Sequence, residues 1–163
     1  YSQDIFETVR FPNLSIHEDT AIILPLIDYV DEVVLIDQSL WYYRQVKSSI
    51  TNIKISKKNF DIFKKNKMQI DFAKKEHPEI LDYVYRLCMN ENDFVMGKCL
   101  KDNSELSQRL FQLCFEQNKE LAEKTNHRKF LYRYVFVYRS IMLLTNIILK
   151  SDIIRGIAKK FLT

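Results

Sequence analysis

The chain has 163 residues, of which 47% are hydrophobic and 28% charged, so it is predicted to form one ordered domain with a sizeable core. It contains only two glycines, which excludes phosphate-binding loops of the GxGxxG and GxxxxGK[ST] types. The net charge of +4 is divided unevenly, because residues 1–37 hold eight acidic residues against the single base Arg10 and the remainder is basic. A basic body is compatible with phosphate, nucleic acid or an anionic membrane.

Cysteine and histidine patterns predict no metal or redox site. Three cysteines stand 11 and 15 residues apart, which matches no zinc or redox spacing, and the three histidines are scattered. We therefore expect reduced, buried thiols in a cytoplasmic protein. The sequence begins at Tyr1, and no stretch has the pattern of a signal peptide, so none is predicted.

The first predicted element is a helix that follows Thr20. Ser15 and Glu18 fit the S-x-x-E capping box, in which a hydroxyl and a carboxylate bond the first free amides of a helix. Pro25 lies within the apolar pattern that follows, and an interior proline costs about 3 kcal/mol, so a bend or a late start is expected. The apolar residues on one predicted face are Ile22, Ile23, Leu26, Ile27 and Val30.

Two β-branched and aromatic runs come next. Residues 33–37 (VVLID) and 40–45 (LWYYRQ) are predicted to be short strands or extended segments.

From about residue 56 onward, the apolar spacing turns helical. Pro78 is expected to open a helix at its first turn. A third helical region, residues 130–149, is apolar nearly all round, but Arg133 and Arg139 interrupt it, and a membrane span needs about 20 predominantly apolar residues. The predicted core stripes are Ile80, Leu81, Val84, Leu87 and Cys88, and Leu106, Leu110, Leu113, Cys114 and Leu121.

Three motifs, F-P-x5-E-D-T, V-V-L-I-D and Y-Y-R-x3-S-S-I-T, lie between residue 1 and about residue 71. Together they resemble the C-terminal half of family 2 glycosyltransferases with a GT-A fold, bacterial enzymes that build capsular, exopolysaccharide or wall polymers. The helical spacing after residue 56 predicts a mostly α chain, which is compatible with the variable C-terminal extensions of such enzymes. Residues 1–55 would be a short α/β remnant of the GT-A domain, with one helix and two short strands, and residues 56–163 a helical extension.

The resemblance also implies an activity, the inverting transfer of a sugar from a nucleotide-sugar donor to a glycan or lipid-linked acceptor. Such a reaction needs a carboxylate that takes the proton of the acceptor hydroxyl. The resemblance gives this role to Asp19, with Glu18 beside it and His17 in substrate binding. The departing diphosphate needs cationic and hydroxyl donors, and Arg44, Lys47, Ser48 and Ser49 match the family's diphosphate loop. The alternatives are a helix start at the acidic pair and a solvated turn at the loop.

Two departures from the family pattern limit this prediction. The chain has no D-x-D, the motif that holds a divalent metal (Mg or Mn) on the donor, and it has no nucleotide-binding half. We therefore expect a fragment that is inactive alone, with the metal ligands elsewhere in the full-length enzyme. The absence of Q-x-x-R-W favours a non-processive enzyme.

Other interpretations stay open. One is a basic helical module that binds nucleic acid or an acidic protein, and another is a structural interaction domain, whereas the glycosyltransferase prediction implies no nucleic-acid partner and leaves a homo-oligomer open. Residues 130–160 combine large apolar residues with bases, which predicts peripheral contact with the inner membrane face. The alternative is ordinary packing in a helical bundle.

Overall fold

The computed structural model describes residues 4–40, 42, 44, 54–125 and 127–150, with side chains as far as residue 144. These residues are mostly helical, and none of them forms a strand, so the prediction of a mostly α chain is confirmed. The elements in chain order are α1 (Ile5–Thr8), α2 (Glu18–Ala21), α3 (Ile23–Tyr29), η2 (Lys57–Phe60), α4 (Asp61–Glu76), η3 (Pro78–Ile80), α5 (Leu81–Cys99), α6 (Glu105–Thr125) and α7 (Val135–Lys150).

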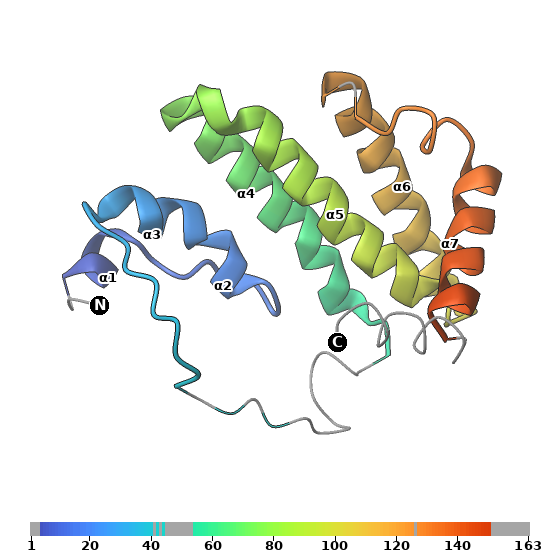
Figure 1. Cartoon of the computed structure of the whole chain (residues 1–163), viewed down its shortest axis with the longest axis horizontal. Coiled ribbons are helices and arrows are strands. Elements are labelled where there is room, and N and C mark those ends of the chain that lie inside the picture. The colour runs from blue at the N-terminus through green and yellow to red at the C-terminus, as the bar shows by residue number, and fades with distance from the viewer. Residues whose placement is uncertain (1–3, 41, 43, 45–53, 126, 151–163) are drawn as a thin grey trace.

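The long helices α4, α5, α6 and α7 form a bundle in which α5 lies between α4 and α6 (Figure 1). The expected stripes supply much of its core, since Val84, Cys88, Leu110 and Cys114 are fully buried. All three cysteines are buried free thiols, as predicted. Pro78 opens the short 3-10 turn that leads into α5, as its missing amide hydrogen favours.

A layer of buried amides crosses this core. Asn66 of α4 donates to Asn92 of α5 (3.1 Å) and to Gln117 of α6 (2.7 Å). Asn92 in turn donates to Gln117 and Asn118, both at 2.8 Å. The Oδ1 atom of Asn66 is buried without a hydrogen-bond partner among the described residues. Because a buried polar group is costly unless it is paired, this layer ties the three helices together in one register.

A second polar cluster joins α7 to the bundle. The carboxylate of Asp93 on α5 accepts hydrogen bonds from the hydroxyls of Tyr132 (2.6 Å) and Tyr138 (2.9 Å). Asn118 (2.9 Å) and Arg128 (3.1 Å) also donate to it. Both tyrosine rings are fully buried, so the segment before α7, through Tyr132, and α7 itself, through Tyr138, are held by the same carboxylate.

The N-terminal unit, residues 4–30, has a small core of its own and packs against α4. Ile5, Val9 and Ile22 form this core. The helix after Thr20 is broken, as Pro25 predicts: α2 ends at Ala21, and α3 restarts at Ile23 with the proline in its first turn, where no intrahelical amide donor is needed.

An ion pair at the far end of α3 also joins it to the bundle. His77, which follows α4, contacts Asp28 of α3 through Nε2 at 2.6 Å and Glu79 through Nδ1 at 3.1 Å. The ring of His77 also contacts Phe72 of α4.

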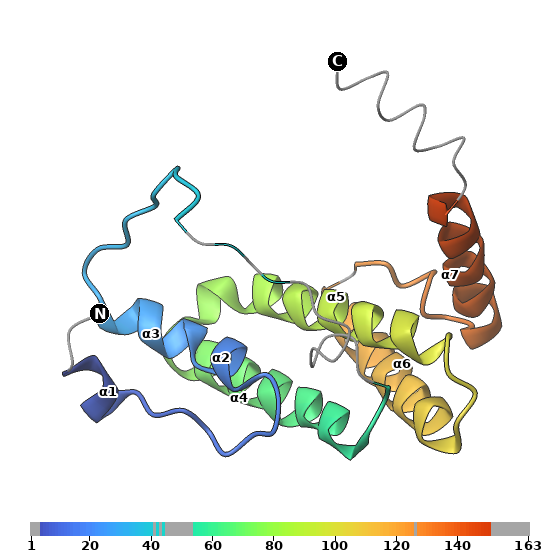
Figure 2. The same cartoon turned by 90° about the horizontal axis from the view of Figure 1, so that it is seen from below.

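The predicted strands are wrong where the structure describes them. Residues 33–37 lie in no helix or strand, no described segment pairs with their backbone, and the side chains of Val33, Val34, Leu35 and Ile36 are 61–93% exposed. A strand needs a neighbour to bond its amides and carbonyls. Figures 1 and 2 show this segment running away from the helices. Of the second predicted strand, residues 40, 42 and 44 are exposed and not in a strand, and residues 41, 43 and 45 lie outside the described residues.

The boundary between residues 55 and 56 stays a prediction. Among the described helices, none is long and apolar enough to cross a membrane.

Candidate functional site

Residues 17–20, here called the acidic turn, contain the predicted catalytic pair. The turn begins at His17, whose φ of 68° lies in the left-handed region, which is uncommon for a residue other than glycine. The carbonyl of His17 accepts hydrogen bonds from the amide of Ala21 (3.0 Å) and from the hydroxyl of Thr20 (3.1 Å). The chain therefore changes direction at His17 and enters α2 directly at Glu18.

The predicted capping box is wrong. The N-cap of α2 is His17, and its side chain makes no capping hydrogen bond. Ser15 instead donates its amide to the carboxylate of Asp61 at the start of α4, at 2.6 Å. This long-range hydrogen bond keeps Ser15 outside the helix, so Glu18 is an exposed residue at the start of α2, with no capping role.

Buried side chains of α4 hold the acidic turn in place by hydrogen bonds. Gln69 donates from Nε2 to the carbonyl of Thr20 at 2.9 Å. Its Oε1 accepts from Nζ of Lys65 at 3.1 Å, and the same ammonium pairs with Glu91 of α5. Lys65 is fully buried, and Gln69 is nearly so. Because both ends of the Gln69 amide have partners, its orientation is determined, and the turn is connected through it to the bundle core.

The charges around the turn follow from this burial. Burial lowers the pKa of Lys65 to about 8, which leaves it a cation at neutral pH opposite Glu91. The pKa of His17 is also lowered, first by burial and then by the positive charge of Lys65. His17 is therefore a neutral imidazole at pH 7, able to donate or accept a hydrogen bond.

The two carboxylates of the turn are open to solvent. Glu18 and Asp19 are exposed, and one oxygen of Asp19 accepts from the amide of Thr20 at 2.7 Å. An exposed carboxylate on a supported turn can reach the hydroxyl of a bound molecule and accept its proton.

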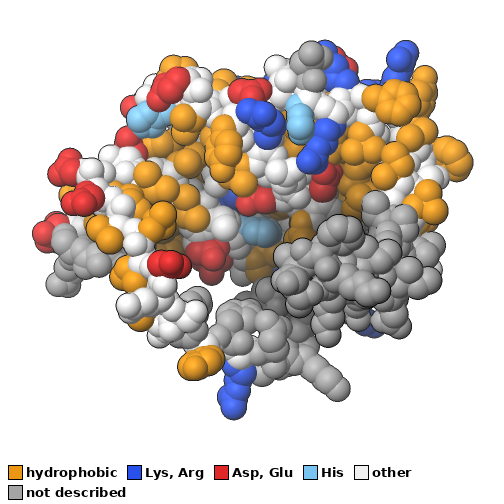
Figure 3. All heavy atoms as spheres, viewed as in Figure 1, with side chains coloured by type: hydrophobic (Ala, Val, Ile, Leu, Met, Phe, Trp, Pro, Cys, Tyr) orange, Lys and Arg blue, Asp and Glu red, His pale blue; other side chains and the backbone are white. Residues whose placement is uncertain are grey.

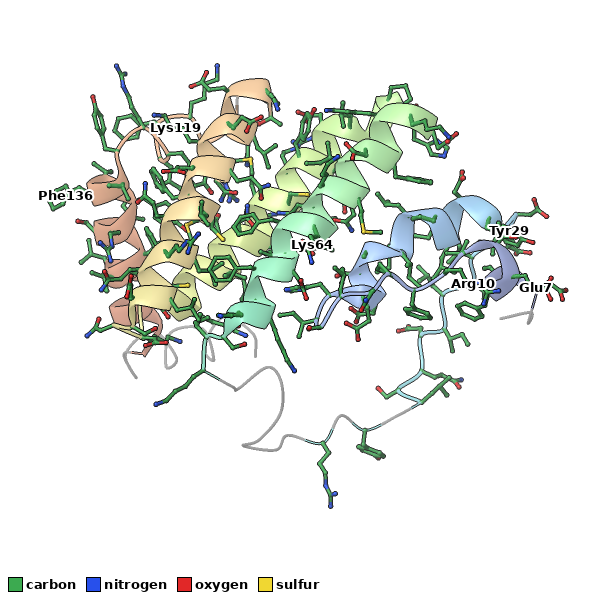
Figure 4. The ribbon with its side chains drawn as sticks, turned by 180° about the vertical axis from the view of Figure 1, so that it is seen from behind. Glu7, Arg10, Tyr29, Lys64, Lys119 and Phe136 are labelled. Atoms are coloured by element: carbon green, nitrogen blue, oxygen red, sulfur yellow. The ribbon has the colours of Figure 1, made fainter. Side chains whose placement is uncertain are left out.

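A shallow groove lies beside the turn, between the N-terminal unit and α4. It has a volume of about 350 Å³, and Ala21, the residue that follows the turn, is among its lining residues. Its walls are mainly apolar and aromatic, with Arg10 and Asp28 as charged groups; Figure 4 shows Arg10 and Tyr29 on the N-terminal unit. The lining residues are Thr8, Val9, Arg10, Ala21, Ile22, Pro25, Asp28, Tyr29, Met68 and Phe72.

The structure brings together only part of the predicted site. His17, Glu18 and Asp19 are neighbours on one turn. Arg44 is exposed on the segment that follows α3, and Lys47, Ser48 and Ser49 lie outside the described residues. Among the residues that the structure describes, no group of histidine, cysteine or acidic side chains could hold a metal ion.

Sequence reasoning missed the support that α4 gives to the turn. Lys65 belongs to a strongly basic run, which hides its position on the inner face of a helix. The spacing of Ile62, Asn66, Gln69 and Ala73 is nonetheless that of one helical face, and this signal could have found Gln69.

Comparison with protein-family models, with curated proteins and with solved structures finds no match to this chain.

Proposed function

We propose that the chain is the C-terminal part of an inverting, non-processive glycosyltransferase of family 2, with Asp19 as its general base. The observation that carries the proposal is that both acidic side chains are exposed while their backbone is held in place. Glu18 and Asp19 are exposed on a turn held to α4 on both sides, by Ser15 through Asp61 and by Thr20 through Gln69.

In the proposed reaction, a hydroxyl of the acceptor lies against the carboxylate of Asp19. As the hydroxyl oxygen attacks the anomeric carbon of the donor sugar, its proton passes to Asp19, and the bond from that carbon to the nucleoside diphosphate breaks on the opposite face. The configuration at carbon is thereby inverted. Neutral His17 orients the hydroxyl by a hydrogen bond, and Glu18 lies beside the base.

The groove beside the turn suits the acceptor. Sugar rings have apolar faces and polar edges, and the groove offers Tyr29 and Phe72 together with Arg10 and Asp28. The proposed acceptor is therefore a glycan or a lipid-linked sugar whose terminal ring lies in this groove, with its free hydroxyl toward Asp19.

The exposed run Val33–Val34–Leu35–Ile36 also supports the proposal. Four large apolar side chains in water are unfavourable, and their extended backbone is available for pairing. In the proposed full-length enzyme this run pairs with the sheet of the nucleotide-binding half, which also supplies the ligands of a divalent metal (Mg or Mn). Arg44, Lys47, Ser48 and Ser49 then bind the donor diphosphate.

The test replaces Asp19 by Asn in the full-length enzyme, which keeps the shape of the side chain and removes its basicity. We expect kcat to fall by about 100-fold or more, as is typical when a general base is lost. Asp31→Asn is the matched control, since it makes the same change at an exposed position outside the turn and should leave kcat unaltered. Near-normal turnover by a folded Asp19→Asn enzyme would exclude Asp19 as the base. The 163-residue chain alone should not turn over any sugar nucleotide.

A further inference from the structure

Exposed aromatic side chains lie on the segment between α6 and α7 and on the first turn of α7, near two tyrosines that are held inward. Tyr132 is fixed in the core by Asp93. Phe130, Tyr134 and Phe136, which lie near Tyr132 along the chain, are 72%, 54% and 76% exposed. Since Tyr138 is bonded to the same carboxylate, the segment cannot turn these rings inward without breaking the cluster.

The apolar surface continues along α7. Ile141, Leu143 and Leu144 are 38–57% exposed, while Met142 packs against the core. Figure 3 shows hydrophobic side chains gathered over this edge of the molecule. A continuous surface of large apolar side chains is unusual on a free monomer and marks a site of association.

The segment that includes these residues carries charges of one sign only. Residues 127–150 contain five bases, Arg128, Lys129, Arg133, Arg139 and Lys150, and no acidic residue. Two of these bases have structural roles, because Arg128 bonds Asp93 and Arg139 lies over the ring of Phe111 at 4.9 Å.

Two of the other bases, Lys129 and Arg133, line a pocket together with Lys119 of α6. It has a volume of about 520 Å³ and is lined by Lys119, Glu123, Lys129, Phe130, Tyr132 and Arg133. Lys129 pairs with Glu123 at 3.1 Å, but this pair is exposed, and such pairs contribute little, so a phosphate can replace the carboxylate. Figure 4 shows Lys119 and Phe136 on the same outer edge of the molecule.

We propose that this surface, comprising Lys119, Lys129, Arg133, Phe130, Phe136 and the outer face of α7, binds an anionic membrane. The cations contact lipid phosphates, and the two phenylalanines enter the boundary between headgroups and acyl chains. Interfacial helices combine these features, with apolar residues on one side and bases at headgroup level. The exposed leucines of α7 favour a bilayer over nucleic acid, because phosphates and bases offer no partner for aliphatic side chains. This inference does not depend on the proposed glycosyl transfer.

The test is cosedimentation of the full 163-residue chain with vesicles of phosphatidylglycerol or of phosphatidylcholine. We expect binding to the anionic vesicles at low salt, weaker binding as salt is raised, and little binding to the neutral vesicles. The double variant Lys119→Gln/Arg133→Gln should lose about 30-fold in partitioning, since each base near an anionic surface contributes about fivefold. Phe130→Ser/Phe136→Ser should also lose binding, whereas Lys64→Gln/Tyr83→Ser, which removes an exposed base and an exposed ring elsewhere, should not.

A spectroscopic measurement reports insertion directly. In a Trp41→Phe background, which removes the single tryptophan, Phe136→Trp should show a blue-shifted emission when anionic vesicles are added. The proposal is overturned if neither vesicle binds at low salt. It is also overturned if binding survives both double variants, if single-stranded RNA binds while vesicles do not, or if the chain forms a dimer through this face that excludes vesicles.

Discussion

Replacing Asp93 by Asn should destabilise the protein, because four side chains donate hydrogen bonds to this one carboxylate. Asp93 accepts hydrogen bonds from Tyr132, Tyr138, Asn118 and Arg128, and its side chain is 19% exposed. Asparagine keeps one of the two acceptor oxygens and offers an amide group where the other stood. It therefore cannot accept from Arg128 and from the two tyrosines together.

The magnitude follows from these contacts. Hydrogen bonds to a charged group contribute about 1.5–3 kcal/mol each, and a neutral one contributes about 1 kcal/mol. Loss of the Arg128 contact and weakening of the others, partly offset by the smaller cost of burying a neutral amide, gives a loss of about 2–4 kcal/mol. For a chain of this size each kcal/mol corresponds to about 2–4 °C in Tm. We expect Tm to fall by about 5–12 °C in thermal unfolding followed by circular dichroism.

A matched control is Asp82→Asn on the same helix. Asp82 pairs with Arg86 at 2.6 Å, but both side chains are about half exposed, and exposed pairs of this kind contribute about 0.5 kcal/mol or less. Its Tm should change by no more than about 2 °C. If the two variants unfold at the same temperature, the Asp93 cluster does not hold α7 to the bundle, and the reasoning is refuted.

The pH dependence of the Asp93 variant gives a second check. Burial raises the pKa of Asp93, although the tyrosine hydroxyls oppose this shift. The folded carboxyl therefore takes up a proton at a higher pH than the unfolded one. As the pH falls from the pKa of Asp93 in the folded protein to its pKa in the unfolded chain, the wild type should gain stability relative to Asp93→Asn, whose amide does not titrate. If the difference in free energy of unfolding between the wild type and Asp93→Asn becomes smaller on acidification, the raised pKa of Asp93 is contradicted.

Two further predictions concern the N-terminal unit. Gln69→Leu removes the donor to Thr20 and one acceptor of the buried Lys65, so amide exchange in residues 17–21 should accelerate and the bundle should lose some stability. Gln112→Leu, at an exposed position of α6, should have neither effect. Unchanged exchange in residues 17–21 would contradict the dependence of the turn on Gln69. The pKa of His77 is raised, mainly by its contact with Asp28 and then by Glu79. The cationic form therefore stabilises the packing of α3 against the bundle. This stabilisation is fully present below the ordinary histidine pKa and is lost as the pH rises through the pKa of His77 in the folded protein. Exchange in α3 should therefore accelerate over that rise in the wild type and not in His77→Gln, and the opposite trend would exclude this role for the ion pair.

Features with a local cause could be predicted from the sequence. Pro25 interrupts a helix and Pro78 starts one because proline lacks an amide donor, wherever the rest of the chain lies. The stripes of α5 and α6 follow from helical periodicity alone. Asp19 and Glu18 are contiguous, so the sequence alone shows that they are neighbours, while their role as site residues stays a prediction.

Features with a distant cause could not. Ser15 fails as a cap because Asp61, 46 residues away, takes its amide. Residues 33–36 have the composition of a strand, but pairing depends on a second segment that composition cannot supply. Gln69 and Lys65 resemble surface residues of a basic helix, and only the positions of Thr20 and Glu91 give them buried partners.

The layer of buried amides has a consequence for how this protein could diverge. If α4 slid by one turn, about 5.4 Å, along α5, Asn66 would leave Asn92 and Gln117, and several amides would be buried without partners. Shifts of α4 along α5 are therefore unfavourable. Small changes in core volume should be accommodated by rearranged side chains and not by movement of the helix. Gln69, which bonds Thr20, stands one turn from Asn66 on the same helix. The position of α4 along α5 therefore also determines where the acidic turn lies relative to the bundle. Loops around the turn can then vary in length and sequence while its carboxylates keep their position.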